Sequence, residues 1–333
     1  MSTARWIRSL VMTVTVAQAA VANAEQVTIT GYDVEQTPGS GWGCWSHTYT
    51  GTISDTGRTV GGGVVCTPEG SKIFDYSVGG GTLNDGVIGI TIDTTHLFTT
   101  RNADDGQPVI PVITLHLAGT FFVNQIDLYG GGMLDNALPG ALDGLTVEIG
   151  GSTLTLATTP LGAPNAIGVP ANDRVDLTGT PLASIPTNQI VLKNFTSSLF
   201  GSPFDQFSIT EIIIDGTALA LTVAIDIKPG GSSNPINMKS RGKIPVAILS
   251  SMSFNAPGQV DRTSLTFGHS GNEDSLDHCG GPKDVNGDGL PDVVCHFNTQ
   301  ATHFVAGDTR GILKGRTLAG DAIQGTDSVR IIH

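Results

Sequence analysis

Four oxygen-bearing side chains lie within nine residues, at positions 1, 3, 5 and 9 of a short loop: Asp284, Asn286, Asp288 and Asp292. Calcium takes about six to eight oxygen ligands at roughly 2.3–2.6 Å, and only a tightly coiled loop can turn alternate side chains onto one ion. Gly289 permits the sharp turn, and Leu290 would add its backbone carbonyl. The three carboxylates repel one another without a cation, so the pattern predicts a calcium site. The alternative is a polar turn that holds no ion.

The residues after this loop exclude an EF-hand. An EF-hand places a glutamate at position 12 and continues as a helix, whereas position 12 here is Cys295, after two valines that favour a strand. Four side chains and one carbonyl leave the calcium shell short of ligands. Water or a further carboxylate would complete it, and Asp277 and Asp308 are the weaker candidates.

The four cysteines form two locally spaced pairs, which predict the disulfides Cys44–Cys66 and Cys279–Cys295. Local pairing is chosen by proximity, since four cysteines allow three connectivities. Free buried thiols are the alternative. His278 and His296 flank the second pair and suggest a zinc site, but a disulfide beside an oxygen-rich loop is favoured in an exported chain.

Export is predicted from the first 24 residues. Arg5 and Arg8 precede an apolar stretch at residues 10–21 and then Ala22-Asn23-Ala24. This order is typical of a Sec-type secretory signal peptide of bacteria with an Ala-x-Ala cleavage site. We therefore expect a secreted or periplasmic protein with no integral membrane segment after cleavage. The remaining length suits two domains, at residues 25–220 and 221–333.

Charge separates the two halves. Residues 25–222 carry 5 basic and 19 acidic residues, whereas residues 223–333 carry 10 and 11. A strongly acidic first domain argues against nucleic acid or an anionic membrane as its partner. It is compatible with cations, neutral glycans or simple solubility.

Alternating apolar and polar residues between Gly-rich turns predict short strands throughout. The predicted class is all-β: a jelly-roll β-sandwich followed by a smaller Ig-like β-sandwich. Strand candidates in the first half include 88–92, 112–117, 122–128 and 209–214.

Three segments of the first half resemble the galactose-binding-like jelly roll of discoidin and coagulation-factor C-type domains and of related carbohydrate-binding modules. They are the turn Gly81-Thr82-Leu83-Asn84-Asp85-Gly86, the central strands 113–117 and 122–129, and the closing strand 209–216. The resemblance implies a second calcium site at Asp85 and Glu211. The alternative is that Glu211 simply points to solvent.

Residues 224–333 resemble a module found at the C-terminal end of many exported proteins of environmental bacteria. The resemblance lies in Ile-Asp-Ile-Lys-Pro-Gly at 225–230, Asn-Pro-Ile-Asn at 234–237, Lys-Ile-Pro-Val-Ala-Ile-Leu at 243–249 and Gly-Thr-Asp-Ser-Val-Arg at 325–330. The loop at 284–292 also resembles the calcium loops of integrin-type propeller repeats and thrombospondin-like repeats. This implies an accessory, non-catalytic module.

Trp42, Trp45 and Tyr49 lie in a Gly-rich loop beside Cys44. Aromatic faces on such loops stack against sugar rings in many sandwich modules, which makes these residues candidates for ligand binding. The alternative, which we favour, is that the rings pack inside one end of the sandwich.

The chain contains no nucleophile elbow, HExxH helix or phosphate loop, so no catalytic residue and no enzyme activity is predicted. The leading hypothesis is a secreted, calcium-stabilised binding or adhesion protein for cell-surface or matrix glycans. The main alternative is a structural surface-layer or matrix protein that assembles through contacts with another surface protein. A glycoside hydrolase is the third reading, and it requires two carboxyl groups facing each other at about 5–10 Å.

Overall fold

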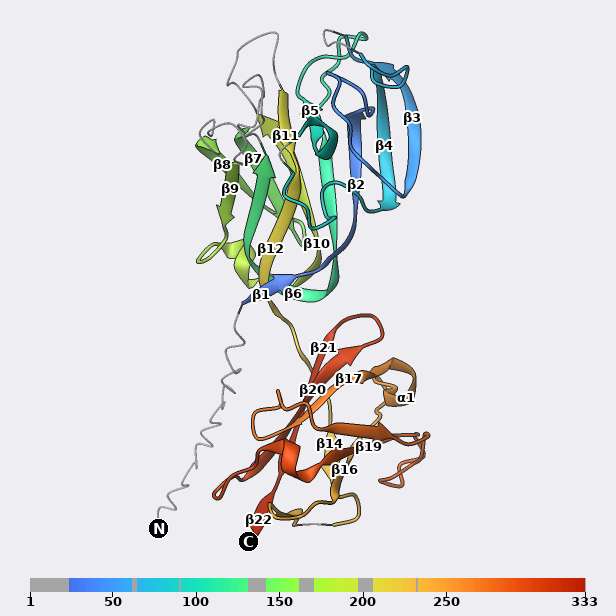
Figure 1. Cartoon of the computed structure of the whole chain (residues 1–333), viewed down its shortest axis with the longest axis vertical. Coiled ribbons are helices and arrows are strands. Elements are labelled where there is room, and N and C mark those ends of the chain that lie inside the picture. The colour runs from blue at the N-terminus through green and yellow to red at the C-terminus, as the bar shows by residue number, and fades with distance from the viewer. Residues whose placement is uncertain are drawn as a thin grey trace, which may run out of the picture.

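The computed structural model describes residues 24–61, 65–89, 91–130, 142–161, 171–196, 206–231 and 233–332. It confirms the predicted all-β class, and Figure 1 shows two β-rich units joined by a short segment after β12. The predicted signal peptide lies almost wholly outside the described residues. No described helix is long and apolar enough to cross a membrane.

The first domain is built from twelve strands and two short 3-10 helices of the described chain. They are β1 (Glu25–Val27), β2 (Ile29–Pro38), β3 (Thr52–Thr59), β4 (Lys72–Gly79), η1 (Ile92–Thr94), β5 (His96–Thr99), β6 (Val112–Gly130), β7 (Leu142–Ile149), β8 (Ser152–Leu161), β9 (Ala171–Asp176), η2 (Pro181–Ser184), β10 (Thr187–Thr196), β11 (Gln206–Ile209) and β12 (Glu211–Ala218).

Strand β6 holds the two layers of this domain together. Its first half pairs with β2 and β10 in the order β3-β4-β2-β6-β10-β7-β8, and its second half pairs with β12 and β9. The two strands predicted at 112–117 and 122–128 are therefore one strand of 19 residues. Gly119 has φ +120°, a conformation that glycine adopts without a Cβ clash, and the chain turns there from one layer into the other.

Apolar side chains from both layers form one core. Alternate residues of β6, such as Ile113, Leu115 and Leu117, face the same interior as Ile212 and Ile214 of β12. The period of two along each strand puts these side chains on a single face. Residues 87–89 are not a strand, so the strand predicted at 88–92 is wrong for its described part.

The second domain has ten strands, one short α-helix and one 3-10 helix in the described chain. They are β13 (Leu221–Thr222), β14 (Ile225–Ile227), β15 (Pro235–Asn237), β16 (Lys243–Ile248), α1 (Ala256–Gln259), β17 (Val260–Gly268), β18 (Leu276–Cys279), β19 (Val293–Asn298), η3 (Thr299–Thr302), β20 (Arg310–Thr317), β21 (Ala322–Ser328) and β22 (Arg330–Ile332).

Two four-stranded sheets of this domain, β14-β16-β19-β18 and β13-β21-β20-β17, enclose a separate core. Val246 and Phe297 of the first sheet pack into the same cluster as Phe267 and Leu313 of the second. The carboxylate of Asp327 accepts hydrogen bonds from the backbone N–H of Ile227 at 2.9 Å and from the Asn234 side chain at 3.0 Å. Hydrogen bonds to Asp327 therefore join three of the segments that resemble the bacterial module, at 225–230, 234–237 and 325–330.

The two domains contact each other where the middle of β6 meets the turn between β20 and β21. The Thr120 hydroxyl donates to Asp321 at 3.1 Å, and Arg316 contacts Glu25 at 3.4 Å. A Cβ on Gly119 would lie 2.6 Å from the carbonyl oxygen of Gly320. Only glycine allows the two backbones to approach this closely.

Candidate functional site

The predicted calcium loop coils around its own backbone amides. One oxygen of Asp284 accepts from the N–H of Gly287 at 2.7 Å and the other from Gly289 at 3.0 Å. The Asp288 carboxylate accepts from the N–H of Leu290 at 2.8 Å, which, with a second bond from the Asn286 side chain, lowers the pKa of Asp288. The expected turn of alternate polar residues is therefore present, and backbone amides of the same loop supply the hydrogen bonds of its carboxylates.

Asp292 differs from the other loop residues because its side chain is 0% exposed. One of its oxygens accepts from the N–H of Ser250 at 2.8 Å and the other from Val285 at 2.9 Å. The Ser250 hydroxyl in turn donates to the carbonyl of Pro291 at 2.6 Å. Asp292 thus ties the end of the loop to the segment that follows β16.

The loop carboxylates do not gather around one point in this structure. Among the described residues, no three His, Cys, Asp or Glu side chains are grouped so that they could hold a metal ion. The residue types still fit calcium, because each carboxylate has about four acceptor positions and the loop amides use only one or two of them. Calcium at this loop remains a prediction.

The two weaker candidates are engaged elsewhere. The Asp277 carboxylate accepts from Lys243 and from the Nδ1 of His278. Asp308 pairs with His269 at 2.9 Å and accepts from the N–H of Val305 at 2.8 Å. The structure groups neither residue with the loop, so their proposed role as extra ligands is not supported.

The structure brings Asp85 and Glu211 together across 126 residues of sequence. Glu211 begins β12, is only 4% exposed, and accepts from the N–H of Gly86 at 2.9 Å. Burial raises the pKa of Glu211 to about 7, and the charge of Asp85 adds to this. The alternative in which Glu211 points to solvent is wrong.

The turn that carries Asp85 is held in place by Asn84. The Asn84 side chain donates to the carbonyl of Ile29 at 3.0 Å and accepts from the N–H of Gly81 at 2.9 Å. A hollow of about 370 Å³ adjoins the pair and is lined by residues 26–29, Asn84, Gly86, Glu211 and Ile212. Two carboxylates sharing a partly buried site favour a bound cation or a proton. The charge of Asp85 acts on Glu211, so the two carboxyl groups are neighbours.

The proposed aromatic ligand site is wrong for both tryptophans. Trp42 is 1% exposed and Trp45 is 4% exposed, and they pack into a small separate core with Val60, Ile73, Leu97, Ala103 and Val109. Tyr49 is half-buried: its hydroxyl donates to the carbonyl of Tyr32 at 2.8 Å, and its ring stacks on Tyr76. The favoured alternative, packing inside the sandwich, leaves the ring faces of the two tryptophans inaccessible to a sugar.

A stacked pair of histidines, His96 buried and His47 half-buried, lies near this aromatic core, and the sequence did not predict it. The rings of His47 and His96 stack with centroids 3.7 Å apart. His47 shares a hydrogen bond with the Tyr76 hydroxyl at 2.8 Å, and His96 shares one with the Thr37 hydroxyl at 2.7 Å. Burial lowers the pKa of His47 to about 4, and burial together with the neighbouring His47 lowers the pKa of His96 well below its usual value. The only sequence signal was that His96 lies within the apolar run of β5.

A polar hollow of about 460 Å³ lies beside the start of β10. It is lined by Thr120, Glu148, Gly150, Gly151, Pro186, Thr187, Asn188, Gln189 and Val191. Its hydroxyl, amide and carboxylate groups match the hydrogen-bonding needs of a polyhydroxylated ligand. Thr120 also contacts Asp321, so the hollow lies at the end of the first domain that meets the second.

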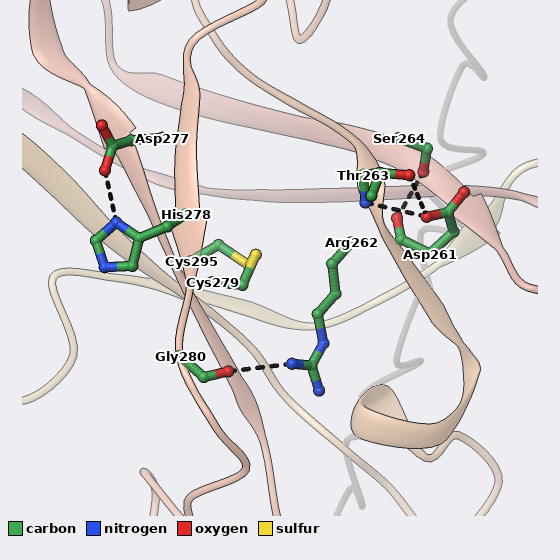
Figure 2. The surroundings of a disulfide bond; sticks show 9 residues. All are labelled: Asp261, Arg262, Thr263, Ser264, Asp277, His278, Cys279, Gly280 and Cys295. Atoms are coloured by element: carbon green, nitrogen blue, oxygen red, sulfur yellow. Dashed lines mark hydrogen bonds and ion pairs between the residues drawn. A yellow bond between two sulfur atoms is a disulfide. The ribbon is translucent and has the colours of Figure 1, made fainter.

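Both predicted disulfides are present. Cys279 and Cys295 lie directly opposite each other on β18 and β19, and Figure 2 shows the bond between them. The zinc alternative at these cysteines is excluded because neither is a free thiol. Nearby, Arg262 of β17 donates to the carbonyl of Gly280 at 3.2 Å and links the two sheets.

No protein-family model and no curated protein matches the chain. Among solved structures, it is similar to a family 32 carbohydrate-binding module from a family 31 glycoside hydrolase of Clostridium perfringens. That likeness has 16% identity and a TM-score of 0.29, and it covers 41% of this chain and 81% of that one.

Two other likenesses are of the same kind. The family 32 module of Clostridium perfringens NanJ, in complex with galactose, has 11% identity and a TM-score of 0.28 over 55% of this chain and 98% of that one. A fucolectin from striped bass (Morone saxatilis) serum has 9% identity and a TM-score of 0.25 over 74% and 89%. These likenesses are too distant for the ligands named in them to be transferred to this chain.

Proposed function

We propose that the chain is an exported, non-catalytic protein that binds glycans and is stabilised by calcium. The observation that carries the proposal is the polar hollow beside β10. Asn188 and Gln189 offer amide donors and acceptors, Thr187 and Thr120 offer hydroxyls, and Glu148 offers a carboxylate that Lys193 holds in place. Such a mixed set on a rigid sheet suits sugar hydroxyls.

Calcium in the first domain is supported by the Asp85–Glu211 pair. A buried carboxylate beside a second carboxylate is costly unless a cation or proton compensates it. A calcium ion there would bridge the turn at Asp85 to the first residue of β12. Its effect would be structural, because it joins two segments far apart in the chain.

Calcium in the second domain is supported by the donor types at residues 284–292. Asp284, Asn286 and Asp288 already lie on one tight coil, and each keeps acceptor positions that the backbone does not use. Export is supported by the two disulfides, which form and persist in oxidising compartments.

The test uses the mature chain, with calcium, on a glycan array, followed by binding measurements for each retained glycan. We expect the double variant Asn188→Ala/Gln189→Ala to bind at least about tenfold more weakly, because each lost hydrogen bond contributes about 1 kcal/mol. Asn172→Ala, an exposed amide on β9, is the matched control. Failure of the wild type to bind any glycan contradicts the function, whereas binding unchanged in the double variant contradicts the location.

The second candidate is assembly with another copy of the chain, and it is favoured by one observation. Strand β8 is an edge of the large sheet, and the ten residues of Ser152–Leu161 carry no charge. Natural edge strands are usually protected by charges, prolines or bulges, as β3 is by the salt bridge of Arg58 to Asp105. In β8 the proline and the ladder irregularity fall beyond Ala157, which leaves Ser152–Ala157 unprotected. Sedimentation should then show oligomers that Thr153→Lys dissociates. A monomeric wild type at high concentration would contradict assembly.

A further inference from the structure

His278 and His296 form an exposed histidine pair in the second domain that nothing above uses. They are direct cross-strand partners on β18 and β19. Their rings stack with centroids 4.6 Å apart and an angle of 7° between the planes. His278 is 56% exposed and lies on the edge strand of its sheet.

The neighbouring disulfide holds the two histidines opposite each other. Cys279 and Cys295 are the next residues along the same two strands, and they are also direct partners. Adjacent residues of a strand point to opposite faces. Cys295 is buried in the core, so His296 and His278 point to the outer face. The covalent bond therefore sets the register of the pair before any ligand arrives.

Asp277 determines which nitrogen of His278 is free. Its carboxylate lies 2.5 Å from Nδ1 of His278 and also accepts from Lys243. The contact between Asp277 and His278 is drawn in Figure 2. An ionised carboxylate only accepts hydrogen bonds, so Nδ1 carries the proton and Nε2 presents its lone pair. A carboxylate on the far nitrogen is the arrangement that orients metal-binding histidines.

His296 presents its Nε2 in a similar way. Its Nδ1 is buried and meets no partner among the described residues, so Nε2 is the nitrogen left to face a ligand. Two imidazole nitrogens on one tetrahedral ion lie about 3.3 Å apart, given metal–nitrogen distances of roughly 2.0–2.1 Å. Because each Nε2 lone pair lies in the plane of its own ring, the two nearly parallel rings must also turn out of their stack to point at one ion, which the exposed side chain of His278 on an edge strand permits.

We propose that His278 and His296 bind a divalent first-row transition metal, such as copper or zinc, through their Nε2 atoms. Imidazole nitrogen suits these ions, and copper(II) binds such sites most tightly. Water completes the coordination, because the pair is open to solvent. Asp277 is a positioning residue, and the nearby Lys243 ammonium opposes the positive ion. This site is separate from the calcium loop and does not depend on glycan binding.

The test titrates the untagged mature chain with copper(II) and with zinc(II), in saturating calcium that fills the carboxylate sites. Calorimetry should show one ion bound per chain, and electron paramagnetic resonance of the copper form should show two nitrogen ligands. We expect His278→Ala and His296→Gln each to weaken binding at least tenfold and to leave one nitrogen.

The matched control is His269→Ala, because His269 is an exposed histidine of the same domain that also pairs with a carboxylate, Asp308. It should leave binding unchanged. Asp277→Asn should weaken binding by about tenfold or more, and Lys243→Met should tighten it. Circular dichroism and thiol titration confirm that each variant is folded with its disulfides. The proposal is overturned if the wild type binds no copper, if His278→Ala binds as the wild type does, or if the spectrum shows fewer than two nitrogens.

Discussion

The two candidate calcium sites satisfy their carboxylates in different ways. In the second domain, Asp284 and Asp288 are exposed and accept from amides two to five residues away. In the first domain, Glu211 is buried and meets a turn that lies 125 residues earlier in the chain. The loop can therefore take its shape before an ion binds, whereas the Glu211 site exists only once the sandwich has closed.

This difference in burial indicates at which of the two sites a bound ion would add more to the free energy of unfolding. Exposed carboxylates are solvated and already accept hydrogen bonds, so an ion adds to a turn that forms without it. A buried carboxylate beside a second carboxylate carries an uncompensated cost that an ion removes. The first domain also holds the stacked pair of His96, which is buried, and His47, which is half-buried. We therefore expect the first domain to respond to pH and to calcium more than the second.

The largest expected effect is that of Asp292→Ala in the second domain. This change leaves the buried amide of Ser250 and the half-buried amide of Val285 without a partner, at about 1–3 kcal/mol for a buried group. Calorimetry should show the second-domain transition destabilised by about 3 kcal/mol or more, with or without calcium. Asp292→Asn, which keeps an acceptor, should lose less. A full recovery of Asp292→Ala by calcium would contradict this bracing role.

Acid should destabilise the first domain through His47. The folded pKa of about 4 lies below the unfolded value of 6.5, so the unfolded chain binds more protons between these values. The stabilisation is complete above pH 6.5 and is lost as the pH falls towards 4, by about 3 kcal/mol for this residue.

The measurement is urea unfolding followed by tryptophan fluorescence, since Trp42 and Trp45 are the only tryptophans after residue 24. His47→Gln removes the titration, so the wild type should lose more stability than this variant between pH 7.5 and 4. Protonation of Glu211 changes the free energy of unfolding in the opposite direction. Both proteins contain Glu211, so its contribution cancels when the stability of the variant is subtracted from that of the wild type. Parallel losses in both would show that His47 does not titrate as described.

Glu211→Gln should remove the calcium response of the first domain. Calcium at 100 times its dissociation constant stabilises a folded site by about 2.7 kcal/mol, and the neutral amide cannot hold the ion equally well. In chelator the variant should be at least as stable as the wild type, because the amide avoids burying a charge. Asp215→Asn, on the same strand, is the control. An intact calcium response in Glu211→Gln would place the ion elsewhere.

The smallest effect is expected for Asp288→Ala in the calcium loop. The side chain is exposed, so in chelator the change should cost less than about 1 kcal/mol. With calcium, the rise in melting temperature of the second domain should be abolished. Asp274→Ala, an exposed carboxylate outside the loop, should keep the rise. A calcium response of normal size in Asp288→Ala would contradict the loop assignment.

Much of the fold followed from local patterns. Alternation of apolar residues over five to ten positions predicts strands, and β12 (Glu211–Ala218) covers most of the segment predicted at 209–214, although Ile209 belongs to β11. The prediction of two strands in place of β6 was wrong: its first half pairs with β2 and β10 and its second half with β12 and β9, and these partners keep the chain extended as one strand across Gly119. The sequence carries no sign of that pairing, which depends on distant segments.

The features of the candidate sites likewise fall into those set by local sequence and those set by the packing of distant segments. The sequence by itself determined the disulfide pairs and the coil at residues 284–292, because these depend on chemistry within about 20 neighbouring residues. Only the tertiary structure decided that Trp42 and Trp45 are buried, that Glu211 meets Asp85, and that His47 stacks on His96. Burial is a collective result of how sheets pack, so a side chain's own type and neighbours do not reveal it.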